Sequence, residues 1–398
     1  MTLQTTGSIS FQDIINEFGE ISSTGDDIGS YRVRQTVGEM TNLPLDEGIP
    51  QGTSSISFAD FYGKKLNIII SYSSSTNRPP SGRNKWNNNT DLTVIGGYKT
   101  RNDLSSSAGT SVTLHVSGNT IIGNQRGEET NQNSRYLSAL RTGGAWNTGT
   151  QLEINIGGEA QVCGGGGNGG DGATDPGENG GEGKHGNSAI GIAYFVSKIT
   201  VQSGGVIAAG AGGGAGGGAG KENSETTNRR ASGGGGGGGA GVPAGLGGDS
   251  AKHGTQSNIS SEGNPGENGE RLNGGDGGNG GSQQQEAIGG GGGGGGCFSA
   301  EQYEREGVVG AGGERGAPQG SGSNEADDGS AGTLSGTGGS GGKGGASESN
   351  SEYSSGGNGG NKGYAVVRRQ GISAPSITNN GLIIGSTTEV TEATNTLL

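Results

Sequence analysis

The sequence predicts a mainly β protein with little helix: a small N-terminal module, a repeated β-hairpin or solenoid-like region, and a bundle of polyglycine-II helices. Glycine supplies 96 of the 398 residues, several times its usual share of roughly 7%. A phrase of strand, glycine turn and strand recurs, and the glycine tracts repeat every third residue. Only 26% of the residues are hydrophobic, so conventional cores cannot extend over the whole length. A flexible low-complexity chain has a similar composition, and the regular organisation argues against it.

Residues 1–65 have the composition of an ordinary small module and contain one motif twice. Ser-Ile-Ser-Phe-Gln-Asp-Ile at 8–14 is echoed by Ser-Ile-Ser-Phe-Ala-Asp-Phe at 55–61. Ser10 and Ser57 stand at N-cap positions, each just before a short hydrophobic segment. The pattern predicts two related helical turns, 11–18 and 58–62, packed on each other, with coincidence as the alternative to duplication.

Residues 66–162 change to a strand pattern and are predicted to form a β domain. Apolar residues alternate with polar ones, and a glycine turn then leads to a second strand. Copies of this phrase lie at 112–123, 152–162, 199–208 and 377–385. Four copies predict a repeated hairpin or a solenoid coil. The third copy is an inserted repeat near 190–209, and the fourth belongs to a C-terminal β segment, 366–398.

Residues 163–365 carry glycine tracts in Gly-Gly-X units, clearest at 274–282 and 336–345. A polyproline-II-type helix has three residues per turn and no internal hydrogen bonds. Gly-Gly-X therefore leaves two faces bare for neighbouring helices, and the X side chains are expected to face solvent. Inter-helix backbone bonds, each worth about 0.5–1.5 kcal/mol, would hold the bundle. Collagen is set aside because the frame breaks after Gly269 and the chain has only 9 prolines.

The charge and the cysteine content exclude several classes. A net charge of −13 disfavours nucleic acid as a partner, since phosphate contacts need a basic face. Two cysteines, Cys163 and Cys297, cannot staple a chain of this size, and inert buried thiols are expected. The first residues show no signal peptide, and the apolar run near 66–70 is too short to cross a bilayer.

No motif predicts catalysis, a cofactor or a metal. GxGxxG matches carry no meaning in so glycine-rich a chain, and His115, His185 and His253 lack ligand spacing. His115 is expected to be a strand residue in a protein wall. Gly-Gly-Asn-Gly-Gly-Asp at 166–171 matches the start of a calcium-binding nonapeptide. However, Ala173 stands where that motif needs a large apolar residue, and no second nonapeptide follows.

The non-repetitive segments between the glycine tracts are the candidate binding surfaces. If the tracts pack as rods, these segments form the turns at the rod ends, where recognition residues often lie. Aromatic and arginine side chains are common at binding hot spots. Each candidate either contacts a partner or only stabilises its own loop. The candidates are Phe298, Tyr303, Arg305, Tyr353, Arg229 and Arg230.

The segment 139–150, followed by strand, Gly-Gly, strand and a glycine tract, resembles glycine-rich tail fibre and receptor-binding proteins of tailed phages. The closing residues 360–367 are similar to the ends of those glycine-rich regions. The rods and loops look like the distal adhesins of long tail fibres, in which polyglycine-II helices stack as a sandwich. The resemblance covers roughly 100–390 and implies that loops between the rods contact a host receptor, either an outer-membrane protein or a glycan.

The resemblance also implies a place in the virion. The paired motif of residues 1–65 looks like the starts of other phage structural proteins, which predicts docking onto a tail or fibre protein. The candidate docking residues are Phe11, Ile14, Phe58, Phe61 and Tyr62. The protein would be synthesised in the host cytoplasm and then reside in the tail. A homotrimer and a single adhesin capping a trimeric fibre are both compatible with the sequence.

Three rival functions remain beside a non-enzymatic adhesin. A purely structural virion protein would use the rods for stiffness and the loops for contacts with neighbouring subunits. A polyglycine-II ice-binding protein would need a flat face of regular small residues, which the charged X positions disfavour. A capsule depolymerase would need a carboxylate pair in a cleft, and the sequence of the β region leaves such a pair open.

Overall fold

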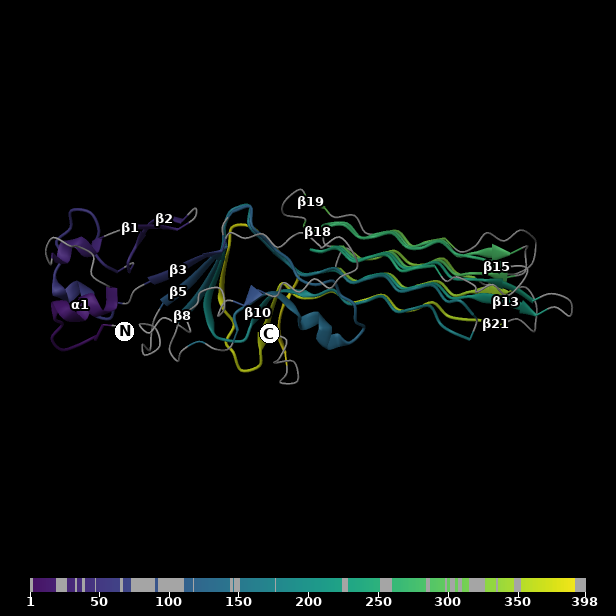
Figure 1. Cartoon of the computed structure of the whole chain (residues 1–398), viewed down its shortest axis with the longest axis horizontal. Coiled ribbons are helices and arrows are strands. Elements are labelled where there is room, and N and C mark those ends of the chain that lie inside the picture. Colours follow the sequence, from purple (N-terminus) through teal and green to yellow (C-terminus); the bar gives the residue numbers. More distant parts are fainter. Residues whose placement is uncertain are drawn as a thin grey trace.

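The structure, a computed structural model, is elongated, with an N-terminal module, a β region and a glycine bundle in succession along its length (Figure 1). It describes residues 3–18, 27–64, 67–72, 90–91, 111–223, 228–250, 260–283, 287–306, 310–314, 326–346 and 352–390, with short gaps at 33, 38–39, 47, 117, 144–145, 147–150, 176, 298, 301–304 and 334–335. The chain is mainly β with a single α-helix among the described residues, as the sequence predicts.

The two copies of the N-terminal motif form helical turns that pack on each other. The module contains α1 (Phe11–Phe18), η1 (Ile28–Arg32), the antiparallel pair β1 (Arg34–Val37) and β2 (Met40–Pro44), and η2 (Phe58–Phe61). Ser10 donates to the Asp13 carboxylate from its N–H at 2.8 Å, and Ser57 donates to Asp60 at 2.7 Å. These reciprocal caps begin both turns. The Phe18 and Phe61 rings then meet edge to face at 6.0 Å.

The β region is a solenoid of three parallel sheets. The first sheet contains β3 (Asn67–Tyr72), β5 (Ser111–Val116), β8 (Gln151–Ile156), β11 (Val196–Val201) and β23 (Ser376–Asn379). The second contains β4 (Thr90–Asp91), β7 (Ser138–Arg141), β10 (Ser188–Ile192), β22 (Val366–Arg369) and β25 (Thr387–Val390). The third contains β6 (Ile121–Ile122), β9 (Gln161–Cys163), β12 (Val206–Ala208) and β24 (Leu382–Ile384).

Each repeated phrase is a coil of this solenoid, and not a hairpin. The two strands of one phrase enter different sheets, and each pairs in parallel with its counterpart in the next copy. The register places Ile154 between Leu114 and Ile199. Stacking like residues in successive coils buries one continuous aliphatic core. The predicted repeat near 190–209 and the segment after 366 form further coils of the same solenoid.

One backbone position recurs in a strained conformation in successive coils. The turn after the first-sheet strand has positive φ at Asn119 (60°), Glu159 (66°) and Gly204 (83°). A side chain at positive φ costs roughly 1–2 kcal/mol, which glycine avoids at the expense of greater chain entropy. We therefore expect Glu159→Gly to stabilise the solenoid by about 0.5–1 kcal/mol in chemical denaturation. Gly204→Ala should have the opposite sign, and a loss of stability in Glu159→Gly would contradict the strain argument.

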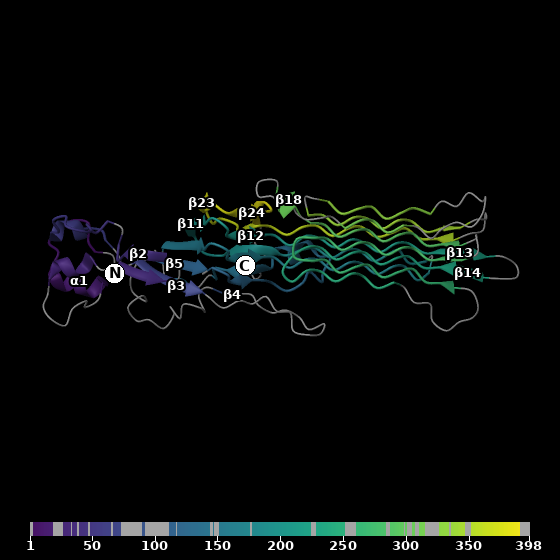
Figure 2. The same ribbon diagram turned by 90° about the horizontal axis from the view of Figure 1, so that it is seen from above.

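The glycine tracts project from the solenoid as parallel and antiparallel rods. The rods are 164–173, 179–188, 209–219, 232–241, 243–249, 262–270, 274–281, 289–297, 310–314, 326–333, 336–344 and 354–363. Rod 164–173 continues β9, and rod 179–188 leads back into β10. Rod 209–219 continues β12. Rods far apart in the sequence therefore lie side by side (Figure 2).

Hydrogen bonds between the rods rotate with a period of three. Gly233, Gly236 and Gly239 donate to one neighbouring rod at Ala173, Gly170 and Gly167. The next residue of each triplet, Gly234, Gly237 and Ala240, donates to a second rod at Gly290, Gly293 and Gly296. The third residues donate to a third rod, 262–270. A helix with three residues per turn requires this rotation; a polyglycine-II geometry in its dihedral angles and rise stays a prediction.

The X side chains also accept hydrogen bonds from the backbone, in addition to the exposure to solvent that the tract pattern predicts. Where a backbone N–H meets no neighbouring rod, an X side chain accepts its hydrogen bond. Asn168 Oδ1 accepts from the Leu246 N–H at 2.9 Å, and Asp276 Oδ1 accepts from the Ala311 N–H at 2.7 Å. Short polar side chains at X therefore complete the hydrogen bonding at the bundle surface.

Candidate functional site

The end of the bundle farthest from the N-terminal module, here called the distal end, gathers several chain reversals (Figures 1 and 2). One small sheet there contains β15 (Ser260–Ser261), β14 (Asn228–Ala231), β13 (Gly220–Asn223) and β21 (Glu352–Tyr353). A second contains β16 (Ser282–Gln283), β17 (Ala287–Ile288) and β20 (Gly345–Ala346). These strands form where non-glycine residues end the rods, so the side chains on the strands are held on a rigid base.

Two side-chain pairs are fixed at the distal end. Arg230 on β14 forms an ion pair with Asp175, which lies in the turn between the first two rods. Tyr353 on β21 is 52% exposed, and the Lys343 ammonium lies 4.9 Å from its ring centroid. An exposed ring whose position is fixed by a strand and a cation can contact a partner with little loss of side-chain entropy. Sequence reasoning missed Asp175 and Lys343, because both occur in turn and Gly-Gly-X contexts that signal only structure.

The predicted binding residues divide between the two ends of the bundle. Arg229 and Arg230 on β14 and Tyr353 on β21 flank β13 at the distal end. Arg305 belongs to β19 (Arg305–Glu306), which pairs with β18 (Ser299–Ala300) where the bundle joins the solenoid (Figure 1). Phe298, Tyr303 and the Arg229 side chain lie outside the described residues. The candidates that the structure describes therefore do not form one surface.

The docking candidates of the N-terminal module divide into buried residues and residues that a partner can reach. Ile14 and Phe61 are completely buried, so they hold the module together and do not face a partner. Phe11 packs partly against that core, and the Tyr62 hydroxyl donates to the Gly7 carbonyl. Phe58 is 43% exposed and lies 6.4 Å from the Phe11 ring. Phe58, with Phe11 and Tyr62 beside it, is the part of the set that a partner can reach.

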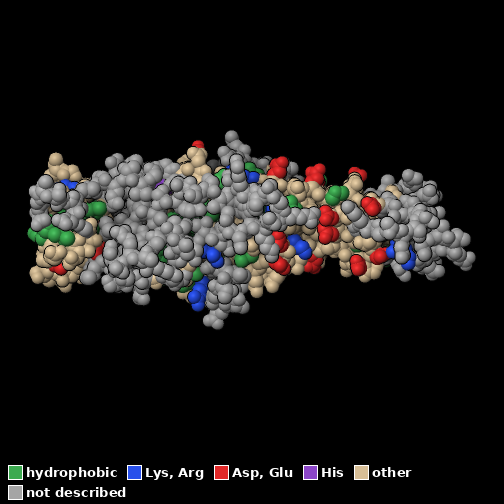
Figure 3. All heavy atoms as spheres, in the orientation of Figure 1, with side chains coloured by type: hydrophobic (Ala, Val, Ile, Leu, Met, Phe, Trp, Pro, Cys, Tyr) green, Lys and Arg blue, Asp and Glu red, His purple; other side chains and the backbone are tan. Residues whose placement is uncertain are grey.

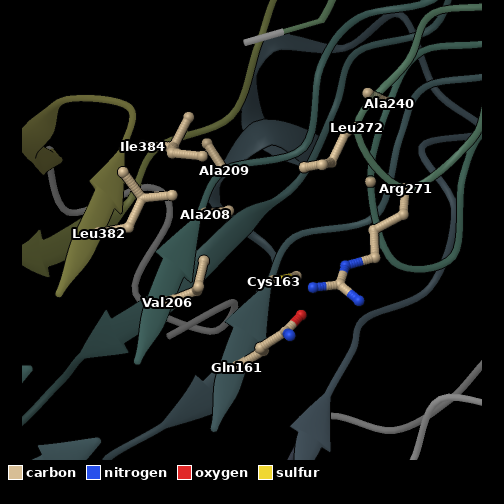
Figure 4. Close-up of a pocket in the computed structure, with 11 residues that line it drawn as sticks. Gln161, Cys163, Val206, Ala208, Ala209, Ala240, Arg271, Leu272, Leu382 and Ile384 are labelled. Atoms are coloured by element: carbon tan, nitrogen blue, oxygen red, sulfur yellow. The ribbon is translucent and has the colours of Figure 1, made fainter. Parts of the chain in front are cut away.

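A small cavity lies between the third sheet and the bundle (Figure 4). Its volume is about 30 Å³. The Gln161 side chain and Arg271 lie at one side, and aliphatic residues of β12 and β24 lie at the other. Gln161 Oε1 is buried and has no hydrogen-bond partner among the residues that the structure describes. A space of this size holds about one water molecule and is too small for an organic ligand.

The remaining motif residues have structural surroundings. His115 is fully buried in β5. His185 Nδ1 accepts from the Asn361 N–H at 2.9 Å, and burial lowers its pKa. In the segment that resembles a calcium motif, Asn168 and Asp171 accept backbone N–H groups. No cluster of three metal-ligating side chains occurs among the residues that the structure describes.

Both thiols are buried and uncharged at neutral pH. Burial raises the pKa of Cys163 from its ordinary value of 9.0 to about 11, and burial raises that of Cys297 in the same direction. Because the buried thiol stays neutral in the folded state, it contributes to the free energy of unfolding. This contribution is fully present below about pH 9 and is lost as the pH rises towards 11. We expect Cys163→Ala to reduce the fall in unfolding free energy between pH 8 and 11 by about 2 kcal/mol. Denaturation at each pH measures this, and an equal fall in unfolding free energy in Cys163→Ala and in the unaltered protein would contradict the prediction.

Acidic side chains are spread along the visible face of the bundle (Figure 3). Exposed carboxylates include Asp171, Glu182, Asp249, Glu267 and Asp276. Carboxylates on this face disfavour contact with a polyanion there. Within the described part of the chain, no helix has the length and apolarity needed to span a bilayer.

Comparisons with known proteins give one family. A family model described as "Phage tail fibre adhesin Gp38" matches residues 84–286. One solved structure, the gp37-gp38 adhesin tip complex of the bacteriophage S16 long tail fiber, aligns at 14% identity with a TM-score of 0.31. That alignment covers 96% of this chain and 100% of the other. No curated protein matches the chain.

Proposed function

This chain belongs to the phage tail fibre adhesin Gp38 family, and from that premise we propose that it recognises its host receptor with the distal end of the glycine bundle. The family match spans half of the chain, so the prediction of a receptor-binding tail fibre adhesin is confirmed. Membership places the protein in the virion tail and points to a non-catalytic role. The proposal concerns the surface that binds the receptor.

The observation that carries this proposal is the convergence of chain reversals at one end. Strands β13, β14, β15 and β21 hold side chains from segments more than a hundred residues apart, including Arg230 and Tyr353. The rods beneath them are bonded to their neighbours through successive backbone amides. Recognition segments on so rigid a base lose little conformational entropy on binding. The pair β18–β19 lies at the other end, close to the solenoid.

We further propose that the N-terminal module docks the adhesin onto a tail fibre protein. The solved complex pairs a gp38 protein with gp37, and in this chain Phe58 leaves an aromatic face exposed at the opposite end from the distal segments. Docking at one end leaves the other free to reach the cell.

Two connections of equal length provide the test. Residues 224–227 join β13 to β14 at the distal end, and residues 301–304 join β18 to β19 near the solenoid. Each is replaced by Gly-Ser-Gly-Ser in the full chain, and binding to susceptible cells is measured by flow cytometry. We expect the 224–227 replacement to abolish saturable binding and the 301–304 replacement to retain it.

The opposite result would move the receptor surface to the solenoid end, where β19 lies. Retention of binding in both variants would overturn the assignment to these connections. If the unaltered protein does not bind susceptible cells, the chain acts as a structural tail protein and another component reads the receptor. Thermal unfolding of each variant shows whether the fold survives.

A further inference from the structure

A groove runs along the flank of the bundle, starting at the end that joins the solenoid, where Ile121 of β6 lines it. It consists of two adjoining hollows of about 330 and 410 Å³. The two hollows share Arg126 and Leu246, so they are continuous. The first, here called the polar hollow, is lined by Arg126, Glu128, Asn168, Asp171, Lys184 and Asp249. The second, the apolar hollow, has walls of Ile121, Val242, Pro243 and Leu246, with Asn268 and Arg271 also lining it.

Three side chains of the polar hollow are fixed by one atom each. Asn168 Oδ1 accepts from the Leu246 N–H at 2.9 Å, and Asp171 Oδ1 accepts from the Asp249 N–H at 2.8 Å. Arg126 donates from Nε to the Ala244 carbonyl at 2.9 Å. Within the described part of the chain, the other polar atoms of these three groups make no hydrogen bond. The structure thus holds one amide donor, one carboxylate acceptor and the guanidinium end in fixed directions beside the groove.

The balance of charge selects the ligand class. Arg126 and Lys184 are opposed by Glu128, Asp171 and Asp249, so a simple anion gains little here. A ligand with many hydroxyl groups can donate to the carboxylates and accept from the cations at once. The ring face of a sugar is apolar, and the adjoining hollow offers Pro243 and Leu246 for that contact. Hollows of about 300 Å³ or more suit small ligands of this size.

We propose that the flank groove binds a neutral oligosaccharide of the host surface glycan. This rests on the proposed function of the chain as a host-binding adhesin, and it adds a second contact at a distance from the distal end. A weak glycan contact along the flank raises the local concentration of the distal end at the cell, so two modest affinities combine.

The test uses the full chain and a defined probe, the neutral oligosaccharide released by mild acid from the surface glycan of a susceptible strain. Asp171→Asn keeps the oxygen that accepts from Asp249 and replaces the second oxygen by an amide donor. Lys184→Met removes the ammonium and keeps the stem. Asp276→Asn is the matched control, because Asp276 makes the same backbone contact, to Ala311, outside the groove. Binding is followed by calorimetry and by saturation-transfer NMR.

We expect saturable binding that weakens about tenfold or more in Asp171→Asn and in Lys184→Met, while Asp276→Asn binds like the unaltered chain and all three keep its unfolding temperature. The proposal is overturned if the oligosaccharide does not bind, if the control weakens binding equally, or if inorganic phosphate competes at equal concentration. If the unaltered chain binds cells but does not bind the oligosaccharide, the groove proposal alone is rejected. Failure of the unaltered chain to bind cells would reject the adhesin proposal itself.

Discussion

Replacing Gly236 with alanine is expected to disrupt the glycine bundle. A Cβ at this position would lie 2.1 Å from the Gly214 carbonyl oxygen and 2.5 Å from its carbon. Both atoms belong to the backbone of a neighbouring rod, whose own amides are bonded to further rods. No flexible side chain is present to move aside, so the rods must separate and lose hydrogen bonds. We expect a loss of about 3 kcal/mol or more, measured by chemical denaturation.

Gly177→Ala is the matched control for this prediction. Gly177 lies in an exposed turn, and a Cβ there would meet nothing within 4 Å. Alanine also restricts the unfolded chain, so this variant should be neutral or more stable by up to about 1 kcal/mol. Equal losses in the two variants would mean that the close approach of the rods does not limit stability.

Replacing Tyr353 with alanine is expected to weaken binding to susceptible cells by about thirtyfold, equivalent to about 2 kcal/mol. The ring is 52% exposed at the distal end and lies beside the Lys343 ammonium. The pairing of β21 with β13 fixes its backbone. Removing an exposed ring leaves the rods untouched, so the unfolding temperature should change little.

Phe195→Ala provides the comparison, because Phe195 is also a solvent-exposed aromatic, at 41%, but lies between β10 and β11 of the solenoid. Cell binding by this variant should match that of the unaltered protein. If the two substitutions reduce binding to the same extent, the distal end is not the distinctive receptor surface. Adsorption measured over a concentration series separates a change in affinity from a change in the amount of folded protein.

The sequence by itself determined which residues enter the solenoid core. Leu152, Ile154 and Ile156 alternate with polar residues, and all three are buried on one face of β8. Alternation is a local property of a strand, because successive side chains point to opposite faces. The capped turns at Ser10 and Ser57 are local in the same sense, since the cap and the carboxylate that closes it are three residues apart. The resemblance carried by the repeats and glycine tracts also predicted the family that the family model then matched.

The choice of partner for each strand and rod was decided only in the tertiary structure. The repeated phrase fits a hairpin as well as a coil, and only stacking on the next copy buries its aliphatic face against like residues. Glycine tracts have almost no side chains to distinguish them, and backbone hydrogen bonds are the same for any residue. The pairing of rods therefore depends on which rods join the solenoid directly and on how long each connection between the other rods is.

This also explains why the candidate surface was only partly foreseen. The sequence located the segments between rods, but each segment lies at one end or the other according to the direction of the rod before it. Rods 209–219 and 336–344 lead to the distal end, where Arg230 and Tyr353 lie, while rod 289–297 leads back toward the solenoid and β19. Residue type determined what each segment can bind. The folding of the rods, with their reversals of direction, determined which segments can bind together.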